Sequence, residues 1–160
     1  MKQASTLFLK ATLFVMGGLA LALCIFAVPA ISNGVGVEWP QLAHLKYPIL
    51  IGGYLTAIPF FLALYQAFRL LTYIDTNTAF SASSVGALKH IKYYGIAMSG
   101  LYAAGMPILF QIANADDAPG LILFGMLFVA APMVIAVFAA VLQKVLQSAI
   151  DIKSENDLMV

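Results

Sequence analysis

Charged residues are absent from four long stretches of the chain, and this pattern predicts its architecture. Residues 11–37, 47–68, 93–115 and 118–143 contain no Asp, Glu, Lys or Arg. Each stretch is long enough for the roughly 20 apolar residues that carry a helix across a hydrocarbon core about 30 Å thick. Residues 121–129 are apolar on every side, whereas a strand of a membrane barrel alternates in polarity. Because lipid cannot hydrogen-bond the backbone, the pattern predicts α-helices.

We therefore expect an all-α integral membrane protein, with residues 1–160 forming one domain, a four-helix bundle. The spans are predicted near 7–31, 47–73, 91–113 and 120–148. Residues 32–46 are expected to form an outer loop, with a turn at the glycines of 33–36, and residues 154–157 to end the last helix. The first span also resembles a secretory signal, but its apolar run exceeds the usual 7–15 residues, so we expect it to be retained.

The basic residues predict the orientation of these helices. In a four-span arrangement only Lys46 falls on one side of the membrane, beside Glu38, and all other basic residues fall on the other side. Loops rich in Lys and Arg remain in the cytoplasm. Both termini and the loop 74–90 are therefore expected to be cytoplasmic, with the protein in the bacterial cytoplasmic (inner) membrane. The predicted cytoplasmic basic residues are Lys2, Lys10, Arg69, Lys89, Lys92, Lys144 and Lys153.

Composition excludes several classes of protein. Hydrophobic residues make up 62% of the 160 residues and charged residues only 9%, against about 25% in a soluble domain. A soluble enzyme and a disordered tail are therefore excluded. The net charge of +1 provides no basic field for phosphates, so direct binding of nucleic acid is not expected. The single cysteine, Cys24, cannot form an internal disulfide.

No set of residues with the spacing of a catalytic or metal site was found. His44 and His90 are predicted to lie on opposite sides of the membrane, and Asp116 and Asp117 belong to a short, solvated turn. The sequence contains no H-E-x-x-H, Walker A or G-x-S-x-G motif. We therefore expect a protein that is not an enzyme and that has no catalytic residue, cofactor or metal ligand.

The inner loop and the C-terminal tail carry the candidate site. Ser81 is a plausible N-cap, after which the pattern becomes that of an amphipathic helix that leads into the third span. The end of the last span continues as an apolar stripe that projects beyond the membrane. Both segments are candidates for docking a cytoplasmic partner, besides their simple role as connectors. The candidate docking residues are Phe80, Ser81, Leu88, Lys89, Ile91, Glu155, Asp157 and Leu158.

Two further hypotheses remain open. A small-solute channel or transporter subunit would use a polar track formed by Tyr54, Thr56, Ser99 and Tyr102, beside the mid-span prolines at 59, 107 and 132. The spans contain none of the ionisable residues that a pump or an ion-coupled carrier usually has. A structural or assembly protein would instead pair with a second copy through the small residues of Gly95-Ser99-Ala103. Packing of that stripe within one chain is the more economical assignment.

Two segments resemble a known family. They are Ala79-Phe80-Ser81 followed by residues 87–91, Ala-Leu-Lys-His-Ile, and the closing residues 155–160, Glu-Asn-Asp-Leu-Met-Val. With the four spans, they make the chain similar to the bacterial DUF2975 family of uncharacterised four-span membrane proteins over nearly its whole length. The resemblance implies no established activity. It implies a small cytoplasmic helix-turn-helix regulator as a partner, because such a protein is often encoded beside family members, and it makes the loop and the tail the natural contact sites.

Overall fold

The computed structural model describes residues 2–158, which form four long helical rods. The first rod comprises α1 (Lys2–Ala22), a π-helical turn (Leu23–Ala27) and α2 (Val28–Glu38), and a 3₁₀ helix (Pro40–Leu45) leads into α3 (Lys46–Asp75). The other rods are α4 (Ala82–Ala115) and α5 (Gly120–Leu158). All four rods are long and apolar enough to cross a membrane. The predicted number and order of spanning helices are therefore confirmed.

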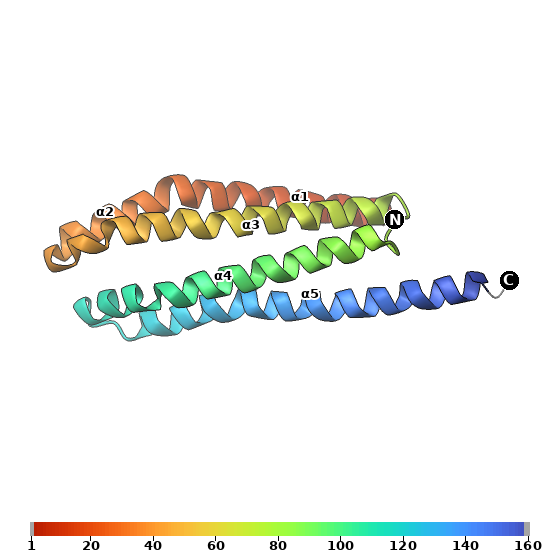
Figure 1. The fold of residues 1–160 in the computed structure, drawn as a ribbon. Helices are drawn as coiled ribbons and strands as arrows, with labels where there is room; N and C mark the ends of the chain where they lie inside the picture. The colour runs from red at the N-terminus through yellow and green to blue at the C-terminus, as the bar shows by residue number, and fades with distance from the viewer. Residues whose placement is uncertain (1, 159–160) are drawn as a thin grey trace.

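The helices pack in chain order and leave the bundle open on one side. In the described part of the chain, α3 packs against α1, α2 and α4, and α5 packs mainly against α4. The first rod and α5 form the two edges of the array (Figure 1). Most large apolar side chains on these edges are exposed, among them Phe14, Leu19, Phe128 and Phe138. In lipid this exposure carries no cost, because hydrocarbon is the solvent.

Both termini and the α3–α4 turn lie at the same end of the array (Figure 1). We call it the basic end, because the charges of Lys10, Lys89 and Lys153 lie on the segments gathered there. The other end, called here the opposite end, holds the 3₁₀ helix and the α4–α5 turn, with Asp116 and Asp117. The chain thus runs along the array an even number of times.

A bend in the first rod coincides with a proline. Pro29 cannot donate to the carbonyl group of Ile25, and the helix adopts a π-helical turn at Leu23–Ala27 immediately before it. The rod changes direction between α1 and α2 (Figure 1). Pro59, Pro107 and Pro132 lie inside α3, α4 and α5 without breaking them. Membrane helices tolerate such prolines when neighbouring groups satisfy the freed carbonyl groups.

The expected turn at residues 33–36 is wrong. These residues are helical, and α2 continues to Glu38 because Val35 is buried in a cluster with Leu42 and Leu45 of the 3₁₀ helix. This packing outweighs the weak local preference of the glycines. The helix ends before Trp39, whose backbone (φ −128°, ψ 85°) lies outside the helical region that a following proline disfavours.

The expected end of the last helix at residues 154–157 is also wrong. α5 continues to Leu158 and is 39 residues long, which corresponds to about 58 Å. Ser, Glu, Asn and Asp differ from good helix formers by only tenths of a kcal/mol, and no Gly or Pro follows to stop the helix. Met159 and Val160, which close the predicted tail motif, lie outside the described residues.

Labelling from one side of the membrane tests the even number of crossings. In a background in which Cys24 is replaced by Ala, we expect Ser5→Cys, Ser83→Cys and Ser154→Cys to react with an impermeant maleimide from the same side. These three positions are exposed at the basic end, whereas His44 is exposed at the opposite end. His44→Cys should react only from the other side. Reaction of positions 5 and 154 from different sides would contradict the fold.

Candidate functional site

The α3–α4 turn at the basic end is held by a compact set of hydrogen bonds. The carbonyl group of Tyr73 accepts bonds from the backbone N–H (2.8 Å) and the hydroxyl (3.2 Å) of Thr78. The carbonyl group of Thr78 in turn accepts bonds from the hydroxyls of Ser81 (2.6 Å) and Ser84 (3.3 Å). Asn77 supplies the positive φ (60°) that the turn requires. These hydrogen bonds therefore fix the backbone of the turn in one conformation.

Ser81 is the N-cap of α4, as predicted. Its backbone is extended (φ −141°, ψ 159°), and its hydroxyl oxygen accepts the N–H of Ser84 at 3.4 Å. The cap satisfies one of the free N–H groups of the first turn. The Ser84 side chain is completely buried, and the amphipathic segment runs into the third span without interruption.

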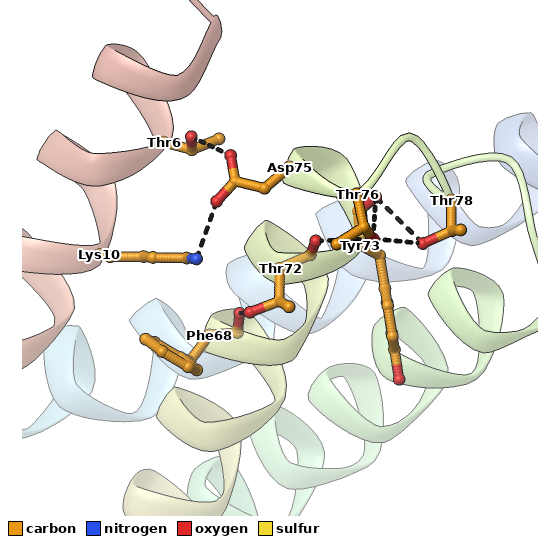
Figure 2. A network of polar contacts seen from close by, with 8 residues as sticks. All are labelled: Thr6, Lys10, Phe68, Thr72, Tyr73, Asp75, Thr76 and Thr78. Atoms are coloured by element: carbon orange, nitrogen blue, oxygen red, sulfur yellow. Dashed lines mark hydrogen bonds and ion pairs between the residues drawn. The ribbon is translucent and has the colours of Figure 1, made fainter.

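A second polar contact joins the first rod to the end of α3. The Asp75 carboxylate accepts hydrogen bonds from the Thr6 hydroxyl and from the Lys10 ammonium, the latter at 2.8 Å (Figure 2). The Lys10 Nζ also lies 5.1 Å from the centre of the Phe68 ring. The side chains of Lys10 and Asp75 are only 19% and 24% exposed. We call Thr6, Lys10 and Asp75 the α1–α3 clamp.

The sequence did not single out this clamp. From the sequence, Lys10 contributes only to the predicted orientation, and no role is predicted for Asp75. The available signal was an isolated base within the first predicted span and an acid that closes the second, both expected on the same side of the membrane. Their contact depends on how α1 lies along α3, which the residues of either helix alone do not reveal.

The eight predicted docking residues divide into exposed and inward-facing groups. Phe80 is 59% exposed and Lys89 is exposed, whereas Leu88 is buried at 7% and Ile91 is half-buried and lines a cavity. Ser81 is half-buried and its hydroxyl is used in the cap. Leu88 and Ile91 therefore belong to the packed side of α4. Glu155, Asp157 and Leu158 are exposed on α5.

The last part of α5 projects beyond its neighbour (Figure 1). Gly95 of α4 lies against Pro132 and Ala136 of the antiparallel α5, so the first residue of α4 lies near residues 145–149 of α5. About ten further residues, or roughly 15 Å, extend past that level. Every residue from 151 to 158 is exposed, including Ile152 at 67% and Leu158 at 84%. The two exposed groups lie at the same end, and in the described chain no hydrogen bond or ion pair joins them.

The small-residue stripe on α4 packs within the chain, as expected. A Cβ added to Gly95 would lie 2.8 Å from the Pro132 carbonyl oxygen, and the buried Ser99 donates its hydroxyl to the carbonyl group of Val129 at 2.8 Å. Ala103, one turn further along, is exposed. Gly95 and Ser99 are thus occupied by α5 and are not available to a second copy.

The predicted polar track does not line a polar passage. Ser99 is engaged by α5, Tyr54 is 42% exposed on the lipid side, and the Thr56 hydroxyl donates to the carbonyl group of Gly53 in its own helix. Apolar cavities lie beside α4 instead, one of them, of about 340 Å³, next to Ser99 and Ala103. The opposite-end cavity has a volume of about 330 Å³ and the basic-end cavity about 360 Å³, and both reach the tilted ring pair Tyr102–Phe128. This geometry gives the channel hypothesis no support.

The described residues contain no group of three or more His, Cys, Asp or Glu side chains that could hold a metal ion. The His90 Nδ1 donates a hydrogen bond to the carbonyl group of Gly86 (2.7 Å), and its ring stacks on Tyr94 at a centroid distance of 6.2 Å. Cys24 is half-buried in the π-helical turn and free.

Comparisons with known proteins agree with the fold. A family described as "Protein of unknown function (DUF2975)" matches residues 30–160. The chain is 57% identical over 160 residues to the "Uncharacterized membrane protein YoaS" of Bacillus subtilis (strain 168), with 100% of both chains covered. No solved structure gives a significant match. The chain therefore belongs to the DUF2975 family, and it is a membrane protein with four helices long and apolar enough to span a bilayer.

Proposed function

We propose that the protein is a non-enzymatic docking protein of the bacterial cytoplasmic membrane that binds a small cytoplasmic helix-turn-helix regulator at its basic end. The distribution of basic residues supports a cytoplasmic location for this end, since loops rich in Lys and Arg stay inside. The termini and the α3–α4 turn gather there (Figure 1). The regulator as a partner rests on the family resemblance alone.

The projecting end of α5 is the observation that carries this proposal. Ile152 and Leu158 expose apolar side chains beyond the level at which α4 begins. Inside the membrane such exposure is satisfied by lipid, whereas an apolar group held in water favours a protein partner. Acidic Glu155 and Asp157 flank Leu158 on the same free segment. A partner with a basic rim around an apolar groove would complement it.

The α3–α4 turn offers a second contact surface at the same end. Phe80 is exposed on a turn whose backbone is fixed by the hydrogen bonds of Thr78 and Ser81, so that binding costs little ordering of the loop. Exposed Lys89 lies two helical turns further along α4. The turn and the start of α4 would thus contribute Phe80 and a positive charge, and the tail would contribute Leu158 and negative charges beside it.

We expect Ile152→Asp combined with Leu158→Asp to weaken binding of the regulator at least about tenfold, because loss of a buried apolar anchor costs over 1 kcal/mol. The measurement is the Kd of the full chain in nanodiscs for a small helix-turn-helix protein of the kind encoded beside family members. Ser148→Asp combined with Ser154→Asp is the matched control, since both serines are exposed on α5. Leu88 and Ile91 are unsuitable for this test because their replacement would disturb packing. An unchanged Kd in the Asp pair would refute docking through the tail.

A further inference from the structure

The opposite-end cavity is formed where α2, α3, α4 and α5 diverge. Its volume is about 330 Å³, and it is lined by Gly52 and Thr56 of α3, Gly105, Met106 and Ile112 of α4, and Phe128 of α5, among others. It lies among apolar residues of the candidate spans and is partly open to the outside of the array. A cavity of this size lies in the range of small-ligand pockets, roughly 300–1,000 Å³.

Water is a poor occupant of this cavity. A buried water needs two to four polar partners, and the lining is almost wholly apolar. The hydroxyl of Thr56 is already used within its own helix, at 2.9 Å from the carbonyl oxygen of Gly53. The ring of Tyr102 packs against Phe128 at a centroid distance of 5.8 Å. The lining therefore favours an apolar occupant over water.

The size of the cavity excludes a helix. A spanning helix is a cylinder about 10 Å across and about 30 Å long, which encloses more than about 2,000 Å³. The available space is about 330 Å³. A slender, flexible hydrocarbon chain can enter such a space from the open side, whereas a folded segment cannot. Among molecules present at this depth, the acyl chain of a phospholipid has that shape.

Four glycines line the cavity, and only two of them are explained by helix packing. A Cβ added to Gly53 would lie 2.8 Å from Val28 Cγ1, and one added to Gly125 would lie 2.3 Å from Leu109 Cδ2. A Cβ added to Gly52 or Gly105 would meet no heavy atom within 4 Å. Close packing against a neighbouring helix therefore does not explain why these two residues are glycines. Their absence of a side chain keeps space open inside the cavity.

A basic residue lies close along the chain to residues that line the cavity. Lys46 begins α3, and Pro48 and Ile49, which line the cavity, follow it within one helical turn. Lys46 is half-buried, its ammonium lies 5.8 Å from the centre of the Tyr47 ring, and in the described chain it forms no ion pair. A lysine ammonium can pair with a phosphate as a point charge.

From these observations we propose that the opposite-end cavity holds an acyl chain of a phospholipid whose phosphate pairs with Lys46. Gly52 and Gly105 provide the space for the chain, and Phe128 and Tyr102 close the inner limit of the site. The site is separate from the docking surface at the basic end, so either proposal can fail without the other.

The test places a large side chain inside the cavity, at a glycine where an added Cβ would meet no other atom. The full chain is reconstituted into vesicles of phosphatidylglycerol and phosphatidylethanolamine, extracted in mild detergent and examined by native mass spectrometry. The wild-type chain should retain phospholipid, and Gly105→Leu should retain at least about tenfold less, because a leucine would overpack an occupied site. Gly100→Leu is the matched control, since Gly100 is exposed on the same helix, also has no heavy atom within 4 Å of an added Cβ, and lines neither cavity.

Two further measurements keep the proposal testable if Gly105→Leu does not fold. Gly52→Leu fills the same cavity from α3 and should have the same effect. In the wild type, a phosphatidylglycerol with a diazirine in its acyl chain should crosslink to Met106, and Lys46→Gln should reduce this product several-fold relative to the wild type. Equal lipid retention in Gly105→Leu and Gly100→Leu, or a lipid-free wild type, would overturn the proposal. A dimer that becomes monomeric on Gly105→Leu would overturn it too, since side chains of a second copy, and no lipid, would then occupy the cavity.

Discussion

Gly95→Leu is expected to lower the free energy of unfolding by about 3 kcal/mol or more, because it forces the α4–α5 contact apart. A Cβ at this position would lie 2.8 Å from the backbone oxygen of Pro132 and 3.1 Å from the Cβ of Ala136. Neither atom is the flexible end of a side chain. The two helices must therefore separate or shift, and Ser99 one turn away would lose its bond to Val129.

Equilibrium unfolding in mixed micelles measures this effect. Gly100→Leu on the same helix is the control, because nothing lies within 4 Å of its added Cβ. Replacement of glycine in a helix gains up to about 1 kcal/mol of helix propensity, which acts equally in both variants. The control should therefore be neutral or slightly stabilised. Similar stabilities for the two variants would show that the close approach at Gly95 does not hold α4 to α5.

Gly125 shows that the distance from an added Cβ to its nearest atom does not alone determine how much a substitution destabilises the protein. An added Cβ there would meet Leu109 Cδ2 at 2.3 Å and Met106 Sδ at 2.7 Å, which is closer than any contact at Gly95. Both are ends of flexible side chains that border a cavity and can move into it. The backbone oxygen opposite Gly95 has no such freedom. Gly95 is thus the more rigid point of the same helix pair.

The four spans could be predicted from the sequence because lipid imposes a simple requirement. A helix that crosses hydrocarbon needs about 20 apolar residues without charge, and each predicted span lies within one observed rod. The N-cap at Ser81 could be predicted for a similar reason, since a capping hydroxyl acts on N–H groups only a few residues away. Both inferences depend on local sequence.

The predictions at residues 33–36 and 154–157 are wrong because local preferences are weak there. Packing against residues elsewhere in the chain, or the lack of a strong stop signal, determines where the helix ends. Two glycines permit a turn without enforcing one, and burial of Val35 against Leu42 and Leu45 kept the helix intact. At the C-terminal end, polar residues were interpreted as a stop although they only weaken a helix slightly. Propensities of tenths of a kcal/mol cannot predict an end point when packing contributes more.

The clamp and the cavities could not be predicted, because they depend on how helices lie against one another. Lys10 and Asp75 are 65 residues apart, and their contact fixes the position of α1 along α3. The cavity beside Gly105 arises from divergence of rods that share no local pattern. The spacing of Gly95 and Ser99 did indicate a contact face, but it could not identify α5 as the partner.

Asp75→Ala is expected to destabilise the protein by about 1–3 kcal/mol. Removing one partner of a fully buried pair costs about 3–5 kcal/mol and of an exposed pair about 0.2–1 kcal/mol, and Lys10 and Asp75 are 19% and 24% exposed. The loss would leave the Lys10 ammonium half-buried over the Phe68 ring without its carboxylate. Asp151→Ala is the control, since this exposed acid interacts with Gln147 of its own helix.

The helix dipole makes the role of Asp75 clearer. Asp75 is the last residue of α3, where the partial negative charge of the helix end disfavours a carboxylate by about 0.3–1 kcal/mol. Its removal therefore relieves one unfavourable interaction, while it breaks the contacts to Thr6 and Lys10. A net loss of stability in Asp75→Ala would mean that the clamp outweighs the dipole.

Exchange of the two charges distinguishes the energy of the Lys10–Asp75 pair from that of the other contacts of Asp75. Asp75→Lys alone would face Lys10 with a like charge, and Lys10→Asp alone would create the opposite repulsion, so each should destabilise more than Asp75→Ala. The double variant Lys10→Asp/Asp75→Lys restores the attraction and places a cation at the C-terminal end of α3, which the dipole favours. We expect its unfolding free energy to exceed the additive value by about 1–3 kcal/mol. The recovery should shrink in high salt, because part of the pair is exposed to solvent. Simple additivity of the two changes would mean that Lys10 and Asp75 do not interact, and that other contacts hold α1 to α3.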